Sequence, residues 1–128
     1  ILCGCKTIEM GKYAPDPNHP PEMLTDTGIT ADPNAPIDCD EEPLVNWANF
    51  GQGLFIQACF GCHYSDSPDR YGAPESVVFD DVGDVWAQRS MVLFTSIGDA
   101  PSMPPNGGTT ELERRMLEIW LTCAPEGT

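Results

Sequence analysis

Lysine and arginine are scarce in this chain. Its 128 residues include 6 of them against 20 aspartates and glutamates, which gives a formal net charge of −14. Proteins that bind nucleic acid need clustered cationic side chains, so the composition argues against a nucleic-acid partner. It argues equally against electrostatic attraction to anionic lipid. The acidic balance instead favours solubility and a partner that presents a basic surface.

Long apolar runs are also missing. No stretch of eighteen apolar residues occurs, so we expect no segment of this sequence to span a membrane. The length suits about one domain. The first residue is Ile1 rather than methionine. We take this as the sign of a processed or trimmed chain whose signal peptide is not in view.

Cysteine, by contrast, is plentiful for a short chain. Such a content indicates an oxidising, extracytoplasmic compartment. Two of the cysteines belong to one motif. The other four can pair in three ways, and the sequence alone does not choose among them. The six are Cys3, Cys5, Cys39, Cys59, Cys62 and Cys123.

The first third of the chain is rich in proline. Seven prolines occur between Lys6 and Pro43, where the apolar residues follow neither a helical nor a strand period. Proline removes a backbone donor and favours extended or turning backbone. We therefore expect residues 1–42 to form an irregular, extended, proline-rich arm, either disordered or laid along another surface. The folded domain is expected over residues 43–128.

The sequence pattern of the folded part predicts an all-α structure. Apolar residues recur at helical spacing over three segments, 43–58, 84–97 and 111–122. Pro43 fits the first position of the first helix, and Gly98 is placed to stop the second. Thr110 and Glu113 form a capping box at the start of the third. No strand pattern is convincing, although residues 76–79 are compatible with a short one.

The motif that carries chemistry is Cys59-Phe60-Gly61-Cys62-His63. The spacing C-x-x-C-H is typical of c-type haem attachment, in which two thiols add to the porphyrin vinyl groups and the histidine reaches the iron. Thioredoxin-like redox motifs share the cysteine spacing, but they expect a βαβ context that is absent around Cys59. A zinc site would need a fourth ligand, and no partner pair stands at a suitable spacing. The motif therefore predicts one covalent haem c.

A second iron ligand is expected from Met103. It lies in a loop with prolines on both sides, which stiffen the backbone and would keep a thioether in place in both oxidation states. The alternative is that Met103 only anchors a buried loop. We expect Met91 and Met116, within predicted helices, to pack in the core. Met10 and Met23 in the arm and His19 in a proline-rich loop are weaker candidates.

From about residue 43 to 123, the sequence resembles the class I monohaem cytochromes c. The attachment motif and the loop Ser102-Met103-Pro104-Pro105 match the family's iron-ligand segments. The crossing of the family's terminal helices is matched by Gly51, Phe55 and Trp120. The resemblance implies three to four helices wrapped around one haem, with His63 and Met103 on the iron and one porphyrin edge near solvent.

The function implied by the resemblance is electron transfer, without enzymatic activity. The partners would be redox proteins, as other subunits of a membrane-associated, extracytoplasmic respiratory or photosynthetic complex. The protein could instead be a mobile shuttle to such a complex, but the long arm favours a fixed subunit, because a subunit can use an arm to wrap a neighbour. The alternative function is a small haem enzyme or gas-sensing domain, which requires a displaceable sixth ligand. The rigid Met103 loop speaks against it.

Further residue roles follow once the resemblance is accepted. Trp86, Arg89 and Tyr71 are candidates for hydrogen bonds to a haem propionate, with ordinary packing or a solvated charge as the alternative. Because the family's terminal helices cross, the ends that carry Cys39 and Cys123 are expected to meet and form a disulfide. The alternatives are two separate thiols or pairing with Cys3 or Cys5.

The extreme N-terminus resembles the end of a bacterial lipoprotein signal. In Leu2-Cys3-Gly4-Cys5, an apolar residue and a glycine precede a cysteine. Processing there would leave Cys5 lipidated and would tether the haem domain to the outer face of a membrane in the periplasm. The alternative is that Cys3 and Cys5 form disulfides, with each other or with a partner.

Overall fold

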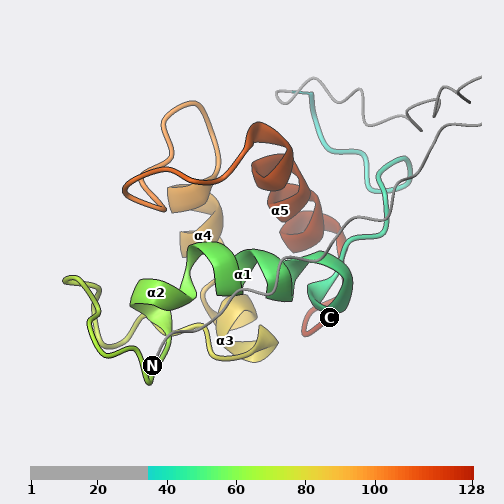
Figure 1. Ribbon diagram of the computed structural model, residues 1–128. Helices are drawn as coiled ribbons and strands as arrows, with labels where there is room; N and C mark the ends of the chain where they lie inside the picture. The colour runs from blue at the N-terminus through green and yellow to red at the C-terminus, as the bar shows by residue number, and fades with distance from the viewer. Residues whose placement is uncertain (1–34) are drawn as a thin grey trace, which may run out of the picture. The chain divides into compact units, whose positions relative to one another are not determined.

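The computed structural model describes residues 35–128, and this part of the chain is all-α, as predicted (Figure 1). A short π-helical turn, η1 (Trp47–Gly51), runs into α1 (Gln52–Ala58). The remaining helices are α2 (Phe60–His63), α3 (Val82–Ala87), α4 (Arg89–Ser96) and α5 (Glu111–Cys123). Residues 76–79 form no strand. Most of the expected proline-rich arm, with Cys3, Cys5 and His19, lies outside the described residues.

The first helical segment begins later than expected. Pro43 was predicted at its first position, but the helical backbone starts at Trp47. The reason is a reciprocal cap: the Asn46 side chain accepts from the amide of Asn49 at 2.9 Å, and the Asn49 side chain accepts from the amide of Asn46 at 2.8 Å. Such a box satisfies amides that a helix start leaves free. The side chain of Asn49 also donates to the Leu44 carbonyl at 2.9 Å, which holds Leu44 outside the helix.

The second predicted helix is two helices. The break falls at Gln88, whose φ of −113° and ψ of 16° leave the helical range. Its side-chain amide donates 2.8 Å to the Val78 carbonyl, so Gln88 ties the helix pair to the preceding segment. The third helix agrees with expectation, because α5 begins after Thr110 with the predicted box to Glu113.

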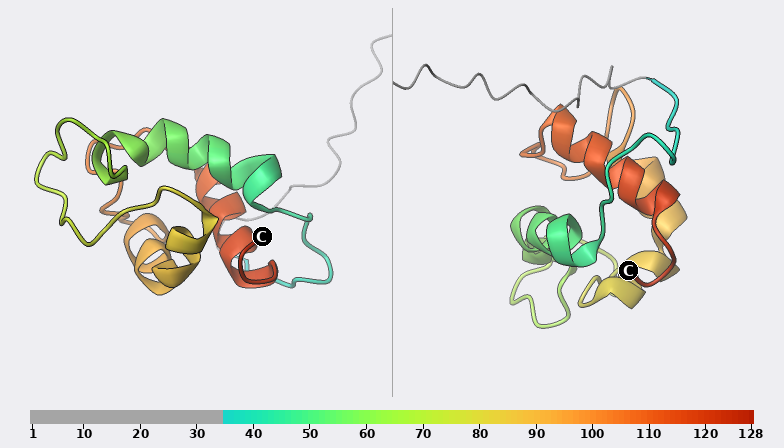
Figure 2. Two further views of the ribbon diagram at one scale, coloured as in Figure 1. Left: turned by 90° about the horizontal axis from the view of Figure 1, so that it is seen from below. Right: turned by 90° about the vertical axis from the view of Figure 1, so that its right-hand side faces the viewer.

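The core is centred on the crossing of the η1–α1 segment with α5 (Figure 2). Trp120 of α5 is fully buried and meets the ring of Phe55 edge-on, with centroids 6.1 Å apart. Its indole nitrogen donates 2.7 Å to the Thr128 carbonyl, which satisfies the one polar atom of the side chain. Gly51 lies against the same ring.

Gly51 tests this crossing directly. A Cβ there would lie 2.6 Å from two ring carbons of Trp120, which is buried and has no room to move away. We expect Gly51→Ala to lower the free energy of unfolding by about 1–3 kcal/mol through overpacking, despite alanine's better helix propensity. Gly53, in α1, is the matched control, because its Cβ would meet nothing within 4 Å. Urea unfolding should show Gly53→Ala as neutral or stabilising, and equal effects of the two substitutions would contradict the packing.

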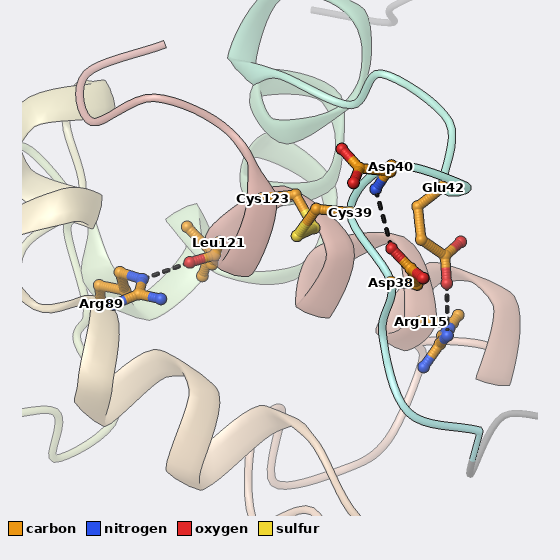
Figure 3. The surroundings of a disulfide bond; sticks show 8 residues. All are labelled: Asp38, Cys39, Asp40, Glu42, Arg89, Arg115, Leu121 and Cys123. Carbon is orange, nitrogen blue, oxygen red and sulfur yellow. Dashed lines mark hydrogen bonds and ion pairs between the residues drawn. A yellow bond between two sulfur atoms is a disulfide. The ribbon is translucent and has the colours of Figure 1, made fainter.

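Residues 35–42 pack against α5 (Figure 3). The sulfurs of Cys39 and Cys123 are bonded, and their Cα atoms are 5.3 Å apart. Arg115, only 5% exposed, donates to the Glu42 carboxylate at 2.6 Å and to the Ala35 carbonyl at 2.7 Å. Burying this cation is tolerable because both contacts are charge-assisted. The packed part of the chain therefore includes residues that precede Pro43.

Candidate functional site

An apolar cleft brings the sequence-predicted ligands together. Cys59, Cys62 and His63, around the α1–α2 junction, share its wall with Met103 from the loop between α4 and α5. The cleft has a volume of about 200 Å³. The rest of the wall is largely hydrophobic and includes Leu54, Phe55, Val77, Phe79, Val92 and Leu117.

The two motif cysteines are half-buried thiols at a break in the helix. α1 ends at Ala58, and Cys59, with φ −117° and ψ −38°, separates it from α2. Burial, with a smaller contribution from the neighbouring Cys62, raises the pKa of Cys59 to about 12. This thiol is therefore protonated at neutral pH. Dithiol oxidoreductases use a cysteine with a lowered pKa, so the site is unlike a thioredoxin-type centre.

His63 is oriented by a backbone carbonyl. Its Nδ1 lies 3.0 Å from the Val77 carbonyl oxygen. A carbonyl can only accept, so Nδ1–H is the donor, and in a neutral imidazole the lone pair is then on Nε2. Metal-binding histidines typically have this arrangement, in which a hydrogen bond at one nitrogen fixes the tautomer and leaves the other to the metal. The ring also packs on Phe79, with centroids 5.2 Å apart.

The loop that carries Met103 is attached to the end of α4. The amides of Ser102 and Met103 both donate to the Thr95 carbonyl, at 2.8 and 3.0 Å. The Met103 side chain is 38% exposed on the cleft wall. Met91 was expected in the core, but it is also 38% exposed and also lines the cleft, from α4. The site thus offers two thioethers, and helical periodicity alone gave no sign of the second.

The three candidates for propionate contacts do not line the cleft. Trp86 packs edge-on against Trp120, and Arg89 lies over the Trp86 ring while its Nε donates to the Leu121 carbonyl. Tyr71 is 78% exposed. The break at Gln88 rearranges the helix that was expected to carry Trp86 and Arg89, and both side chains contact α5.

One cation does line the cleft, and sequence reasoning passed over it. Arg114 on α5 belongs to the wall and donates 2.7 Å to the Thr109 carbonyl.

A metal site built only from protein ligands is not found in this part of the chain. Across residues 35–128, no group of three or more histidine, cysteine, aspartate or glutamate side chains is placed to hold an ion. The zinc alternative for Cys59, Cys62 and His63 therefore finds no fourth ligand among these residues. Among the helices described, none is long and apolar enough to cross a membrane.

Comparisons with known proteins add no relative: no family model matches the chain, and neither a curated protein nor a solved structure is significantly similar to it. Any functional assignment therefore depends on the residues of the cleft and their geometry.

Proposed function

We propose that this domain is an electron carrier of the c-type cytochrome kind, with one covalent haem in the cleft. The observation that carries the proposal is the meeting of two thiols, an imidazole and the Met103 thioether on one largely apolar wall, although Met103 stands 40 residues after His63. These groups are the donor set of a His/Met-ligated haem c. Their chemical state also suits haem attachment, because neither thiol is in a disulfide and the His63 hydrogen bond uses Nδ1 rather than Nε2.

Each residue then has a defined task. Cys59 and Cys62 would hold the haem through thioether bonds from their Sγ atoms, formed by addition of S–H across a vinyl group without net oxidation or reduction. His63 would offer Nε2 and Met103 would offer Sδ as ligands to the iron. The apolar wall excludes water and so limits solvent reorganisation. The haem, when bound, supplies the one-electron chemistry.

The alternative of a haem enzyme or gas sensor needs a ligand that leaves easily. Two backbone hydrogen bonds from residues 102 and 103 to Thr95 hold the Met103 loop, which favours a fixed ligand and simple electron transfer. The redox partner is expected to present a basic surface, because the described residues carry 15 acidic and 4 basic side chains. The proposal also includes an extracytoplasmic location and a lipid anchor on Cys5. The protein would then be a subunit of a larger membrane-associated complex.

The test is to produce the chain in cells that carry out c-type haem attachment. We expect a purified protein whose mass includes one haem after denaturation and whose visible spectrum changes reversibly on reduction. A protein that leaves the same cells without haem, or with zinc on the motif, would overturn the proposed function.

Met103 and Met91 provide a matched pair for the distal ligand. Methionine ligation raises the potential relative to nitrogen ligation, so Met103→Ala should lower the reduction potential. It should also abolish the weak long-wavelength band that marks Met–Fe coordination in oxidised c-type cytochromes. Met91→Ala, equally exposed on the same wall, should leave both unchanged. The reverse outcome would transfer the ligand role to Met91.

A further inference from the structure

The segment between His63 and Phe79 is held together by hydrogen bonds rather than by a core. None of residues 64–77 is buried. The amide of Phe79 donates 2.8 Å to the His63 carbonyl, which closes the segment into a loop. Within that loop, the side chain of Arg70 makes three hydrogen bonds, more than any other side chain there.

Arg70 contacts carbonyls at both ends of the loop. Its guanidinium donates to the Tyr64 carbonyl at 3.2 Å, to the Pro74 carbonyl at 2.7 Å and to the Val77 carbonyl at 2.8 Å. Only the planar fork of arginine directs several donors to fixed acceptors in this way, and a lysine ammonium cannot reproduce it. The hydrogen bonds of Arg70 therefore stabilise the loop, in which no side chain is buried.

The Val77 carbonyl is also the acceptor for His63 Nδ1, at 3.0 Å. Its oxygen has two lone pairs and can serve both donors at once. We propose that Arg70 is a positioning residue for the iron ligand: by fixing the Val77 carbonyl, it fixes the tautomer and the ring orientation of His63. The proposal rests on the proposed function, because it gives His63 the role of iron ligand. Arg70 does not itself line the cleft.

The deciding variant is Arg70→Lys in the haem-loaded protein, because it retains the positive charge but loses the fork. Freeing the Val77 carbonyl should weaken the bond to Nδ1, so we expect the His63 Nδ1–H to exchange with solvent about tenfold faster by NMR. A less firmly hydrogen-bonded imidazole is a weaker electron donor and stabilises the ferric state less. The reduction potential should therefore rise.

Arg89→Lys is the matched control. Arg89 also donates from its guanidinium to a backbone carbonyl, that of Leu121, but it lies outside the cleft. Exchange and potential should both stay at the wild-type values in this variant. If Arg70→Lys does not accumulate, Arg70→Gln is measured by exchange alone, with the same acceleration expected.

Unchanged exchange and potential in Arg70→Lys, or equal changes in Arg89→Lys, would overturn the role of Arg70. Failure of the proposed function is a different result, because it appears in the wild-type protein as the absence of covalent haem. The two failures are thereby separated.

Discussion

Replacing Cys59 and Cys62 together with alanine is expected to leave the protein with no covalently bound haem. Both thiols lie on the wall of the cleft beside His63, and neither is used in a disulfide. Without them no thioether can form, so any haem that enters is held only by its iron ligands and apolar contact. Mass spectrometry of the denatured protein should show the full haem increment in wild type and none in the double variant.

The control for this experiment removes the other described cysteine pair. Cys39→Ala with Cys123→Ala deletes the same number of sulfurs at the C-terminal end of α5, and neither of these residues lines the cleft. That variant should retain the whole haem increment. Covalent haem in the Cys59/Cys62 variant would show that attachment takes place elsewhere, and its loss from both variants would attribute the effect to folding.

Loss of the Cys39–Cys123 disulfide is expected to lower the free energy of unfolding by about 2–5 kcal/mol, the range for native disulfides in small domains. The bond spans a sequence separation of 84 residues, so it restricts most of the folded chain when the domain is unfolded. It also joins residues 35–42 to the end of α5, where Arg115 and Glu42 provide the other polar connection (Figure 3).

Urea unfolding of Cys39→Ser with Cys123→Ser measures this loss, and reduction of the wild-type protein should reproduce it. Non-reducing peptide mapping provides the independent check. Alkylation of either cysteine in the untreated protein, or a stability change within about 0.5 kcal/mol of zero, which is typical of surface substitutions, would count against the bond.

The sequence by itself determined features that depend on neighbouring residues. The Cys59-to-His63 motif is a spacing rule, and one turn of chain is enough to present its side chains together. The box between Thr110 and Glu113 is equally local, and α5 begins where that box predicts. Three helical segments followed from periodicity, and the all-α class followed from these segments together with the resemblance to class I cytochromes c. The capping box between Asn46 and Asn49 is local too. The helix start was nevertheless predicted at Pro43, three residues before Asn46, because proline is common at the first helical position.

Only the tertiary structure decided which faces meet. Periodicity places Met91 and Trp86 on helices, but it does not say that one lines the cleft and the other packs against α5. The break at Gln88 is stabilised by a bond to Val78, ten residues away, and no propensity of the helix itself predicts it. Arg70 gave no signal in sequence, because its partners are backbone carbonyls, which every residue possesses. Bonds from a side chain to a backbone carbonyl across a loop depend on the folded path of the chain, and that path is fixed by packing rather than by local pattern.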